Sequence, residues 1–303
     1  MKNVLIDCDP GHDDAVAIVL GNQLANLTSI TTVAGNTDLT NTTRNALALV
    51  ELMGVTVPVH SGADKPLNGE VRDAQHVHGK SGFGGTDLSE PSVGTTSDDA
   101  VSHIIEASHT VQDLWLVAVG PLTNVALAIQ ADPTLGERLA GVSIMGGSTD
   151  AGNSTATAEF NIWADPEAAR VVFAAGLNPI VCGLNLTRQV LTDDVFINSI
   201  RTSGSTLGTF VADLYGYMHD RLDELLGMRR AALHDPCALL AVTHPELFEL
   251  EEMYVDVEVN GELTRGMTVF DQRPALNKPP PNCQVATGVD ANAVLALIRD
   301  CLS

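Results

Sequence analysis

The sequence predicts an α/β fold, in which one domain spanning residues 1–303 carries a mostly parallel, Rossmann-like sheet flanked by helices. Short apolar or β-branched runs alternate along the chain with helix-like segments, which is the pattern of a parallel sheet covered on both faces. Polar motif residues follow the ends of these runs, and open α/β sheets bind ligands at the carboxyl ends of their strands. No internal repeat or convincing linker divides the chain, so we expect a single domain with its active site at that edge.

Each expected element has a local signal in the sequence. Residues 4–6 form an apolar run, and the Pro10-Gly11 turn separates it from helix-like residues 15–20. The other strands expected in this sheet are residues 29–34, 55–59, 114–119, 142–145 and 179–182. The helices expected are residues 42–53, a helix from 122, one opened by Asp165-Pro166-Glu167 and ending at 175, residues 192–232 with a break at 203–205, residues 237–242, and a last helix capped by Asp290. Residues 254–259 and 267–270 should form a peripheral hairpin.

The turn after the first strand is unusually acidic. Asp7, Asp9, Asp13 and Asp14 fall within eight positions. Aspartates in the first turn of a helix commonly cap free N–H groups, which would account for Asp13 and Asp14. Capping does not explain two aspartates at the end of a buried strand, because clustered buried carboxylates repel one another unless a cation holds them. Carboxylate oxygens favour Ca²⁺ or Mg²⁺.

Charge excludes two classes of partner. The formal charge is −22, and the chain has only four lysines, Lys2, Lys65, Lys80 and Lys278. A negative field of this size repels nucleic-acid phosphates and anionic membranes, so we expect neither as a partner. It favours cations and neutral substrates. The acidity is also compatible with a salt-rich cytoplasm.

Cysteine usage and the amino terminus indicate a cytoplasmic protein. The five cysteines are scattered without a CxxC pair and are expected to be reduced thiols, mostly buried. The amino terminus lacks a basic-then-apolar leader, and no apolar run is long enough to span a bilayer.

Five motifs, in the same order, resemble those of the inosine–uridine-preferring nucleoside hydrolases. They are Asp-Cys-Asp-Pro-Gly-His-Asp-Asp-Ala at 7–15, Val-Gly-Pro-Leu-Thr-Asn-Val-Ala-Leu-Ala at 119–128, Met-Gly-Gly at 145–147, Ala-Glu-Phe-Asn-Ile-Trp-Ala-Asp-Pro-Glu-Ala-Ala at 158–169 and His-Asp-Pro-Cys-Ala at 234–238. Together they extend over most of the chain. The resemblance implies calcium-dependent hydrolysis of the N-glycosidic bond of ribonucleosides, giving ribose and a free nucleobase.

The resemblance also implies a catalytic metal centre. Asp9, Asp14 and Asp235 would be the carboxylate ligands of Ca²⁺, and the main-chain carbonyl of Thr123 would complete the protein ligands. Asp9 would in addition accept the proton of the attacking water. His234 would face the nucleobase and assist its departure. Asp7 is expected to act from behind the ligands rather than as one of them.

Further positions are implied to bind the substrate. Asp13 would hold the ribose 2′-hydroxyl, and His78 would line the base pocket. The remaining substrate-binding positions implied are Asn36 and Asn161 for the 2′/3′ side of the ribose, Asn153 and Glu159 for its 5′-hydroxyl, and Met145 beside the sugar. Phe160, which stands between Glu159 and Asn161 in the sequence, is also implied to bind the substrate. Residues 192–232 would fold over the base as a lid, and the family suggests a homodimer or homotetramer. We expect His12 and His60 to have ordinary packing roles, and Trp163 to pack in the core.

Two other functions remain open at this stage. Aspartate-based, Mg²⁺-dependent phosphohydrolases also place Asp-x-Asp after the first strand, but they need a later lysine for the phosphate, and none is convincing here. A non-catalytic protein that binds calcium or ribose would share the acidic turn. A ribose-release assay would separate it from an enzyme. Base preference, purine or pyrimidine, is not decided by any motif.

Overall fold

The computed structural model describes residues 1–84, 86, 88–274 and 277–303. An eight-stranded sheet runs through the molecule in the order β3-β2-β1-β4-β5-β6-β12-β9. Neighbouring strands are parallel except for β9, which is antiparallel to β12 at the edge. The strands are β1 (Asn3–Cys8), β2 (Asn26–Thr32), β3 (Val59–Ser61), β4 (Leu114–Ala118), β5 (Gly141–Met145), β6 (Ile180–Cys182), β9 (Phe248–Met253) and β12 (Cys283–Val289). The predicted α/β fold with a mostly parallel sheet is confirmed.

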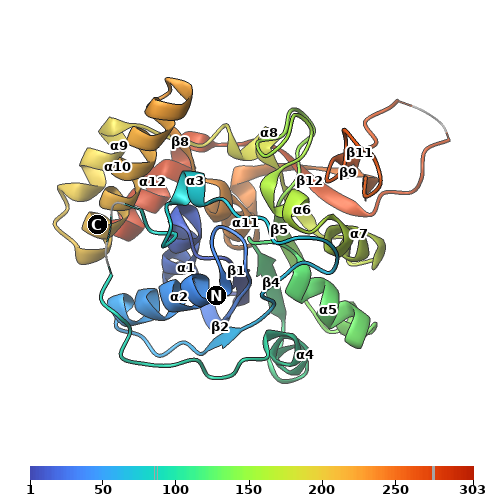
Figure 1. Cartoon of the computed structure of the whole chain (residues 1–303), viewed down its shortest axis with the longest axis horizontal. Helices are drawn as coiled ribbons and strands as arrows, with labels where there is room; N and C mark the ends of the chain where they lie inside the picture. The colour runs from blue at the N-terminus through green and yellow to red at the C-terminus, as the bar shows by residue number, and fades with distance from the viewer. Residues whose placement is uncertain (85, 87, 275–276) are drawn as a thin grey trace.

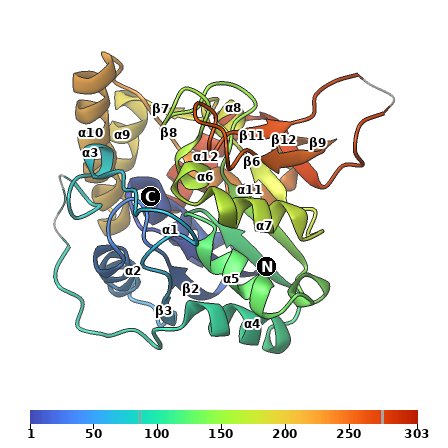
Figure 2. The same cartoon turned by 45° about the vertical axis from the view of Figure 1, so that its right-hand side comes forward.

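Helices cover both faces of this sheet, as Figures 1 and 2 show. The longer helices are α1 (His12–Leu24), α2 (Leu39–Met53), α4 (Ala100–Thr110), α5 (Thr123–Ala131), α7 (Pro166–Ala174), α9 (Asp194–Arg201), α10 (Thr206–Leu226), α11 (His234–Thr243) and α12 (Ala291–Leu302). The short ones are α3 (Gln75–His78), α6 (Phe160–Ala164), α8 (Leu184–Thr187) and the 3₁₀ turns Leu135–Glu137 and Pro245–Leu247. The buried apolar side chains form two clusters. One includes residues of α1, α2, α10, α11 and α12, and the second includes residues of α4, α5 and α7.

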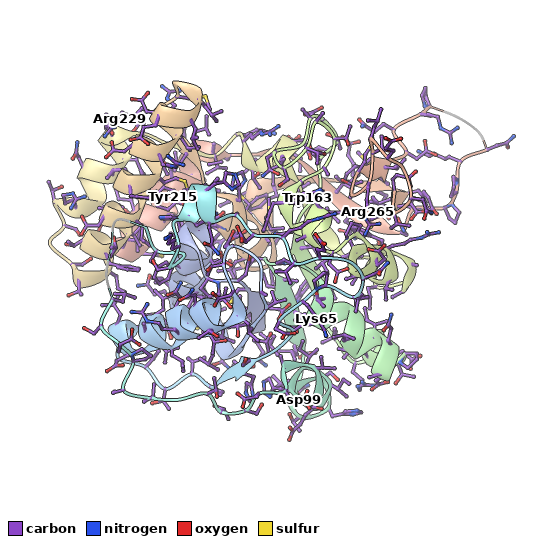
Figure 3. All side chains as sticks on the ribbon, in the orientation of Figure 1. Lys65, Asp99, Trp163, Tyr215, Arg229 and Arg265 are labelled. Atoms are coloured by element: carbon purple, nitrogen blue, oxygen red, sulfur yellow. The ribbon has the colours of Figure 1, made fainter. Side chains whose placement is uncertain are left out.

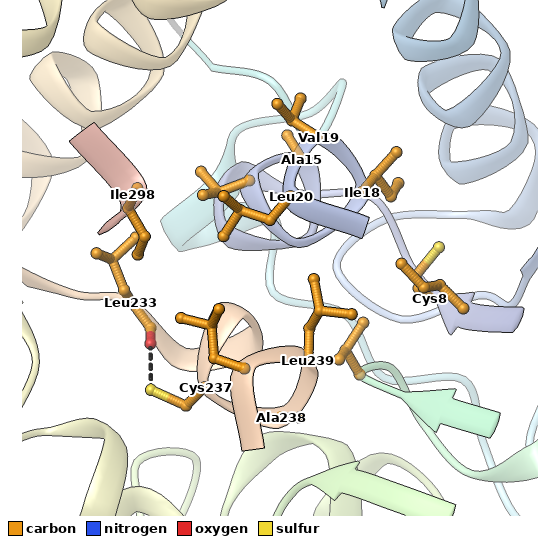
Figure 4. Packing of buried hydrophobic residues seen from close by; sticks show 14 of the residues in the cluster. Cys8, Ala15, Ile18, Val19, Leu20, Leu233, Cys237, Ala238, Leu239 and Ile298 are labelled. Atoms are coloured by element: carbon orange, nitrogen blue, oxygen red, sulfur yellow. Dashed lines mark hydrogen bonds between the residues drawn. The ribbon is translucent and has the colours of Figure 1, made fainter. Parts of the chain in front are cut away.

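The contact between α1 and α11 sets the geometry of the site. Both helices are apolar on all sides and buried along most of their length. Figure 4 shows Ala15 and Leu20 of α1 near Ala238 and Leu239 of α11, within one packed cluster. Burial of this kind stabilises by roughly 25 cal/mol for each Å² of apolar surface removed from water. The packing fixes two helices that are more than 200 residues apart in sequence with their first turns at the same edge of the sheet.

The strand predicted at residues 55–59 is wrong in its bounds, because β3 begins only at Val59. Gly54 ends α2 in a left-handed conformation, and the N–H of Val55 still bonds the carbonyl of Val50. Pro58 has no N–H to donate to a ladder. Pairing with β2 therefore starts one residue later.

The carboxyl-terminal part adds strands that the periodicity did not predict. β9 and β12 extend the sheet beyond β6, and β7 (Leu191–Thr192) pairs with β8 (Ala231–Ala232) as a small separate ladder. The predicted hairpin is confirmed as β10 (Val255–Val257) with β11 (Thr268–Phe270). The break between α9 and α10 and the cap of α12 by Asp290 are also confirmed. No helix in the described ranges is long and apolar enough to cross a membrane.

Two side-chain expectations have different outcomes. All five cysteines are free, and four are buried, as expected. Trp163 is only half-buried, so its prediction as a core residue is wrong. The guanidinium of Arg72 stacks on its ring, 4.2 Å from the ring centroid, as a cation–π contact.

Candidate active site

The site begins where β1 ends, between the ends of β2 and β4. Asp9 lies one residue beyond β1, and Gly35 and Gly120 follow the two neighbouring strands. A Cβ atom added at Gly120 would lie 2.6 Å from Asp9 Oδ1, and one added at Gly35 would collide with Asp9 Oδ2. The two glycines therefore leave the room that this carboxylate occupies.

Asp14 closes the turn between β1 and α1. Its Oδ1 accepts from the N–H of Asp9 at 3.1 Å, and its Oδ2 accepts from the N–H of Gly11 at 2.9 Å. The side-chain amide of Asn36 donates to Asp14 Oδ2 and to the carbonyl of Asp9, both at 3.0 Å. These bonds fix Asp9, Asp14 and Asn36 relative to one another before any ligand binds.

Asp235 joins this turn from the first turn of α11. One carboxylate oxygen from each of Asp13, Asp14 and Asp235 lies within 4.8 Å of the others, a spacing that could hold a metal ion. All three side chains are buried. We call these residues and Asp9 the acid cluster. The triad of Asp13, Asp14 and Asp235 differs from the implied carboxylate ligands, which are Asp9, Asp14 and Asp235. Asp13, which precedes Asp14 in the first turn of α1, stands in the triad where the implied set has Asp9.

Burial and mutual repulsion disfavour the charged forms of the acid cluster. Burial is the largest cause that raises the pKa of Asp9 and Asp235 well above the usual range, and repulsion from other members of the cluster adds to it. Burial and the charge of Asp14 raise the pKa of Asp13 to about 7. Burial also raises the pKa of Asp14, against the lowering effect of the Gly11 and Asp9 N–H groups. A divalent cation would remove this conflict.

The donor set fits a hard divalent cation. Within the described part of the chain, Asp9 Oδ1 is buried and has no hydrogen-bond partner. The groups that meet here are carboxylate oxygens, which hard cations such as Ca²⁺ prefer. Asp7, the next-to-last residue of β1, lies outside the triad. Its Oδ1 accepts from Thr31 Oγ1 at 2.6 Å and from Asn124 Nδ2 at 2.8 Å, whereas its Oδ2, like Asp9 Oδ1, is buried without a partner in the described ranges.

Thr123 is the first residue of α5, three positions after Gly120. Its side chain points away from a ligand role, because Oγ1 donates to Asp165 Oδ2 at 2.7 Å. Asp165 Oδ2 also accepts from the N–H of Leu67 at 2.8 Å, and Asp165 Oδ1 accepts from the N–H of Ala168 at 3.0 Å. Asp165 thus caps α7 and holds the start of α5. The expected use of the Thr123 carbonyl stays a prediction.

Asn161 and Met145 meet at the ends of β4 and β5. The Asn161 amide donates to the carbonyl of Val119 at 2.7 Å and to that of Met145 at 3.1 Å. Its amide nitrogen also lies 3.5 Å from Met145 Sδ. Both side chains are buried. As with Asn36, the side-chain NH₂ group donates to acceptors of the protein itself, which leaves the Oδ1 oxygen available to a ligand.

Glu159 and Asn153 organise the neighbouring loop. Glu159 accepts from the N–H groups of Gly147, Asn161 and Ile162 at 2.9 to 3.2 Å and caps α6. Burial nevertheless raises the pKa of Glu159 to about 7. Asn153 is exposed, and its Oδ1 accepts from the N–H of the half-buried Phe160 at 2.9 Å. The structure therefore brings Glu159 close to Asn161, with Asn153 and Phe160 farther out.

His12 and His78 contact each other beside the acidic turn that joins β1 and α1. His12 Nδ1 and His78 Nδ1 are 3.0 Å apart, and the His12 ring stacks on Tyr217 with centroids 5.6 Å apart. Burial lowers the pKa of both histidines, that of His12 to about 4. An ordinary packing role was expected for His12, near the sheet edge, but its contact with His78 makes it a neighbour of the site, and its position between Gly11 and Asp13 was the signal for this. His60 hydrogen-bonds Ser97 instead, and its ring stacks on that of His103 in α4.

His234 opens α11, directly before Asp235. Its Nδ1 lies 2.7 Å from the hydroxyl oxygen of Thr187 in α8. Burial lowers the pKa of His234 to about 4, and the charge of Arg188 contributes. His234 also lies near enough to His78 to lower its pKa further. The two histidines implied to face the nucleobase are thus brought to one side of the acid cluster.

Helix α10 covers that side. It packs against α3, and Arg221 Nε donates to the carbonyl of His76 at 2.8 Å. Tyr215, seen beside α3 in Figure 3, is buried. Burial is the largest cause that raises the pKa of its phenol, and the charges of Asp13 and Asp235 add to it. The expected lid within residues 192–232 stays a prediction.

These features define an α/β protein with a group of buried aspartates, able to hold a metal ion, at the carboxyl edge of its parallel sheet. The profile of the "Inosine-uridine preferring nucleoside hydrolase" family matches residues 4–296. The pyrimidine-specific ribonucleoside hydrolase RihA of Salmonella paratyphi A is 40% identical over 302 residues, covering 98% of this chain and 97% of the relative. The inosine-uridine preferring nucleoside hydrolase of Crithidia fasciculata is 39% identical over 311 residues, covering 99% and 97%.

Solved structures agree with this match. A purine-preferring ribonucleoside hydrolase from Gardnerella vaginalis superimposes with a TM-score of 0.93 at 30% identity, covering 99% of this chain and 98% of that one. The chain therefore belongs to the inosine–uridine-preferring nucleoside hydrolase family and is a ribonucleoside hydrolase. This excludes both the phosphohydrolase and the non-catalytic binding protein considered above.

Proposed function

We propose that this enzyme hydrolyses the N-glycosidic bond of purine and pyrimidine ribonucleosides in a calcium-dependent reaction, giving ribose and a free nucleobase. The observation that carries the calcium proposal is the acid cluster: buried carboxylates with raised pKa values, one of them with an oxygen that has no partner among the described residues. The relatives' names differ in base preference, which is why both classes of nucleoside are included.

The acid cluster would hold the ion through Asp9, Asp14 and Asp235, with the Thr123 carbonyl beside them. Bound there, Ca²⁺ would balance the clustered charge, acidify a coordinated water and anchor the ribose hydroxyls. Asp13, which lies within the same group of carboxylates, would accept a hydrogen bond from the 2′-hydroxyl.

Asp9 is the proton acceptor in this proposal. Its Oδ2 is already engaged by the N–H of Asn36 at 2.6 Å, whereas Oδ1 has no donor in the described ranges. Oδ1 can therefore take a proton from water as the oxygen approaches C1′. Burial and neighbouring carboxylates raise the pKa of Asp9 in the isolated protein, which favours the protonated product of this step.

The remaining residues bind the ribose and stabilise the transition state. Asn36 and Asn161 would offer their Oδ1 oxygens to the 2′- and 3′-hydroxyls, because their amide N–H groups already bond protein acceptors. Glu159 and Asn153 would take the 5′-hydroxyl, with Phe160 and Met145 against the sugar. The nearby carboxylates favour positive charge on the ring as the C1′–N bond breaks. His234 and His78 would assist the departing base.

We further propose that the enzyme is cytoplasmic. Free, mostly buried cysteines are in keeping with a reducing, cytoplasmic setting. The high negative charge argues against nucleic acid or an anionic membrane as partner. We also propose a homodimer or homotetramer, for which family resemblance is the support.

The experiment is a substrate panel with chelation. Purified enzyme is incubated with inosine, adenosine, uridine and cytidine, and reducing sugar is measured with CaCl₂, with EDTA, and with EDTA followed by excess CaCl₂. The proposal expects ribose release that EDTA abolishes and CaCl₂ restores. Hydrolysis that is indifferent to chelation would refute the calcium assignment.

A further inference from the structure

Among the described residues, the imidazole of His234 has one hydrogen-bond partner, a buried hydroxyl. Thr187 Oγ1 lies 2.7 Å from His234 Nδ1, and the Thr187 residue is fully buried. No other hydrogen bond of this hydroxyl occurs among the described residues. A buried hydroxyl without an acceptor loses free energy, so its proton belongs in this contact.

The backbone before His234 is anchored to the same segment as Thr187. β7 pairs with β8 through Leu191 with Ala232 and Thr192 with Ala231. The N–H of Leu233 donates to the carbonyl of Val190 at 3.0 Å. Residues 187–192 therefore hold both the main chain that leads to His234 and its ring. Nothing else in this small ladder has been given a role.

We propose that Thr187 is a positioning residue, which donates its hydroxyl proton to Nδ1 of His234 and thereby keeps the ring's hydrogen on Nε2, directed at the departing nucleobase. The inference rests on the role of His234 in the proposed function. It adds no covalent step: Nε2–H donates a hydrogen bond without giving up its proton, while the electron pair of the C1′–N bond moves onto the base.

The alternative direction of the contact has a clear chemical consequence. If Nδ1 carried the hydrogen and donated to Thr187, Nε2 would have only a lone pair. Such a ring accepts hydrogen bonds and cannot stabilise negative charge building on a leaving base. The hydroxyl of Thr187 thus decides whether His234 is a donor or an acceptor at the substrate.

The chain offers matched variants for a test. Thr187→Val removes the hydroxyl and keeps the shape, and Thr187→Ser keeps the hydroxyl. Ser29→Ala is the control, because Ser29 is also buried and its Oγ lies 2.8 Å from His103 Nε2, a histidine of α4 outside the site. His234→Ala reports the full effect of losing the imidazole.

Each variant is assayed with calcium on inosine and on p-nitrophenyl ribofuranoside, whose leaving group needs no help. Thr187→Val should lower kcat for inosine about 10- to 100-fold, as loss of an orienting partner commonly does. Its kcat for the p-nitrophenyl substrate should stay within about threefold of wild type, because general assistance to the leaving group is not used there. Thr187→Ser should restore inosine hydrolysis, and Ser29→Ala should leave the hydrolysis of both substrates unaffected.

¹⁵N NMR of histidine-labelled, calcium-loaded enzyme provides an independent readout. Wild type should show His234 with hydrogen on Nε2 and a bare Nδ1, and Thr187→Val should lose this preference. A wild-type ring with hydrogen on Nδ1 overturns the inference, as does a Thr187→Val enzyme that is slowed equally on both substrates or is not rescued by serine. If His234→Ala itself fails to distinguish the substrates, the proposed role of His234 fails and this inference with it. If only Thr187→Val fails to do so, the proposed function stands and this inference alone is wrong.

Discussion

Two groups of acidic residues lie at or next to helix starts near the carboxyl edge of this sheet, and the surroundings of their carboxylates differ. Glu159 and Asp165, the capping acids, each accept three protein hydrogen bonds, most of them from backbone N–H groups. In the acid cluster, Asp14 also accepts three protein hydrogen bonds. Its neighbours Asp9, Asp13 and Asp235 are buried facing one another's charge instead, and Asp9 Oδ1 has no donor in the described chain.

The difference separates structural from functional carboxylates. A buried carboxylate with several N–H donors stabilises the fold, because its charge is solvated by the protein. Buried carboxylates that repel one another cost stability unless a ligand joins them. We therefore expect substitutions of Asp9 and Asp235 to remove activity and spare the fold, and substitution of Asp165, which has no role in the proposed function, to do the reverse.

The largest effect is expected at Asp9. Asp9→Asn should lower kcat/KM for inosine by about three orders of magnitude or more, because it removes both the proton acceptor and a carboxylate beside the metal. Its melting temperature without calcium should not fall. Asp99→Asn, which alters an exposed cap of α4, is the control and should retain activity. An Asp9→Asn enzyme with near wild-type kcat/KM would show that Asp9 is not a functional carboxylate and would contradict the distinction between the two groups.

A smaller effect is expected from Asp235→Asn on calcium affinity. Loss of an orienting partner weakens metal binding about 10- to 100-fold, so loss of a ligand should weaken it by about 100-fold or more. Calorimetric titration with CaCl₂ measures this directly. Without calcium the variant should be at least as stable as wild type, because a carboxylate with a raised pKa has been replaced by a neutral amide. Unchanged affinity would remove Asp235 from the ligand set.

The capping acid Asp165 should show the opposite profile. Asp165→Ala leaves three donors unpaired and should lower the free energy of unfolding by about 2 to 4 kcal/mol. At saturating calcium its kcat should fall less than about tenfold, since it touches no reacting atom. Asp290→Ala removes an exposed cap of α12 and serves as control, with a loss of about 1 kcal/mol. Urea unfolding and initial rates test both. A stable but inactive Asp165→Ala would place this residue with the acid cluster.

The smallest effect concerns the pH dependence of stability at Glu159. Its pKa is raised from 4.5 to about 7 in the folded protein, so the folded state binds its proton more tightly than the unfolded state does. Its contribution to stability is full below about pH 4.5 and is lost as the pH rises through 7. Glu159→Gln should therefore flatten the decline in unfolding free energy between pH 5 and 8 in calcium-saturated enzyme. Parallel curves for the two proteins would show that Glu159 is not the group that titrates.

The sequence was informative where one segment carries both the element and the site. The apolar run of β1, the Pro10-Gly11 break and the acids of α1 lie within a dozen residues, and their arrangement was predicted correctly. The same holds for Asp290 as the cap of α12. Such features depend on neighbouring residues, whose geometry follows from local rules.

Features that depend on distant partners could not be predicted. β9 reads Phe-Glu-Leu-Glu-Glu-Met, a half-exposed pattern that becomes a strand only because β12 pairs with it at the edge. The contact of His12 with His78 joins residues 66 positions apart, and that of Thr187 with His234 joins residues 47 apart. No spacing in the chain signals either pair. The packing of the helices decides them.

The central claim is that the acid cluster binds one calcium ion on which hydrolysis depends. The most direct measurement titrates CaCl₂ into chelator-treated enzyme and records bound calcium and ribose release from inosine in the same samples. We expect one high-affinity ion per chain, with activity rising in proportion to its occupancy. Full ribose release before any calcium is bound, or binding that leaves activity unchanged, would contradict the claim.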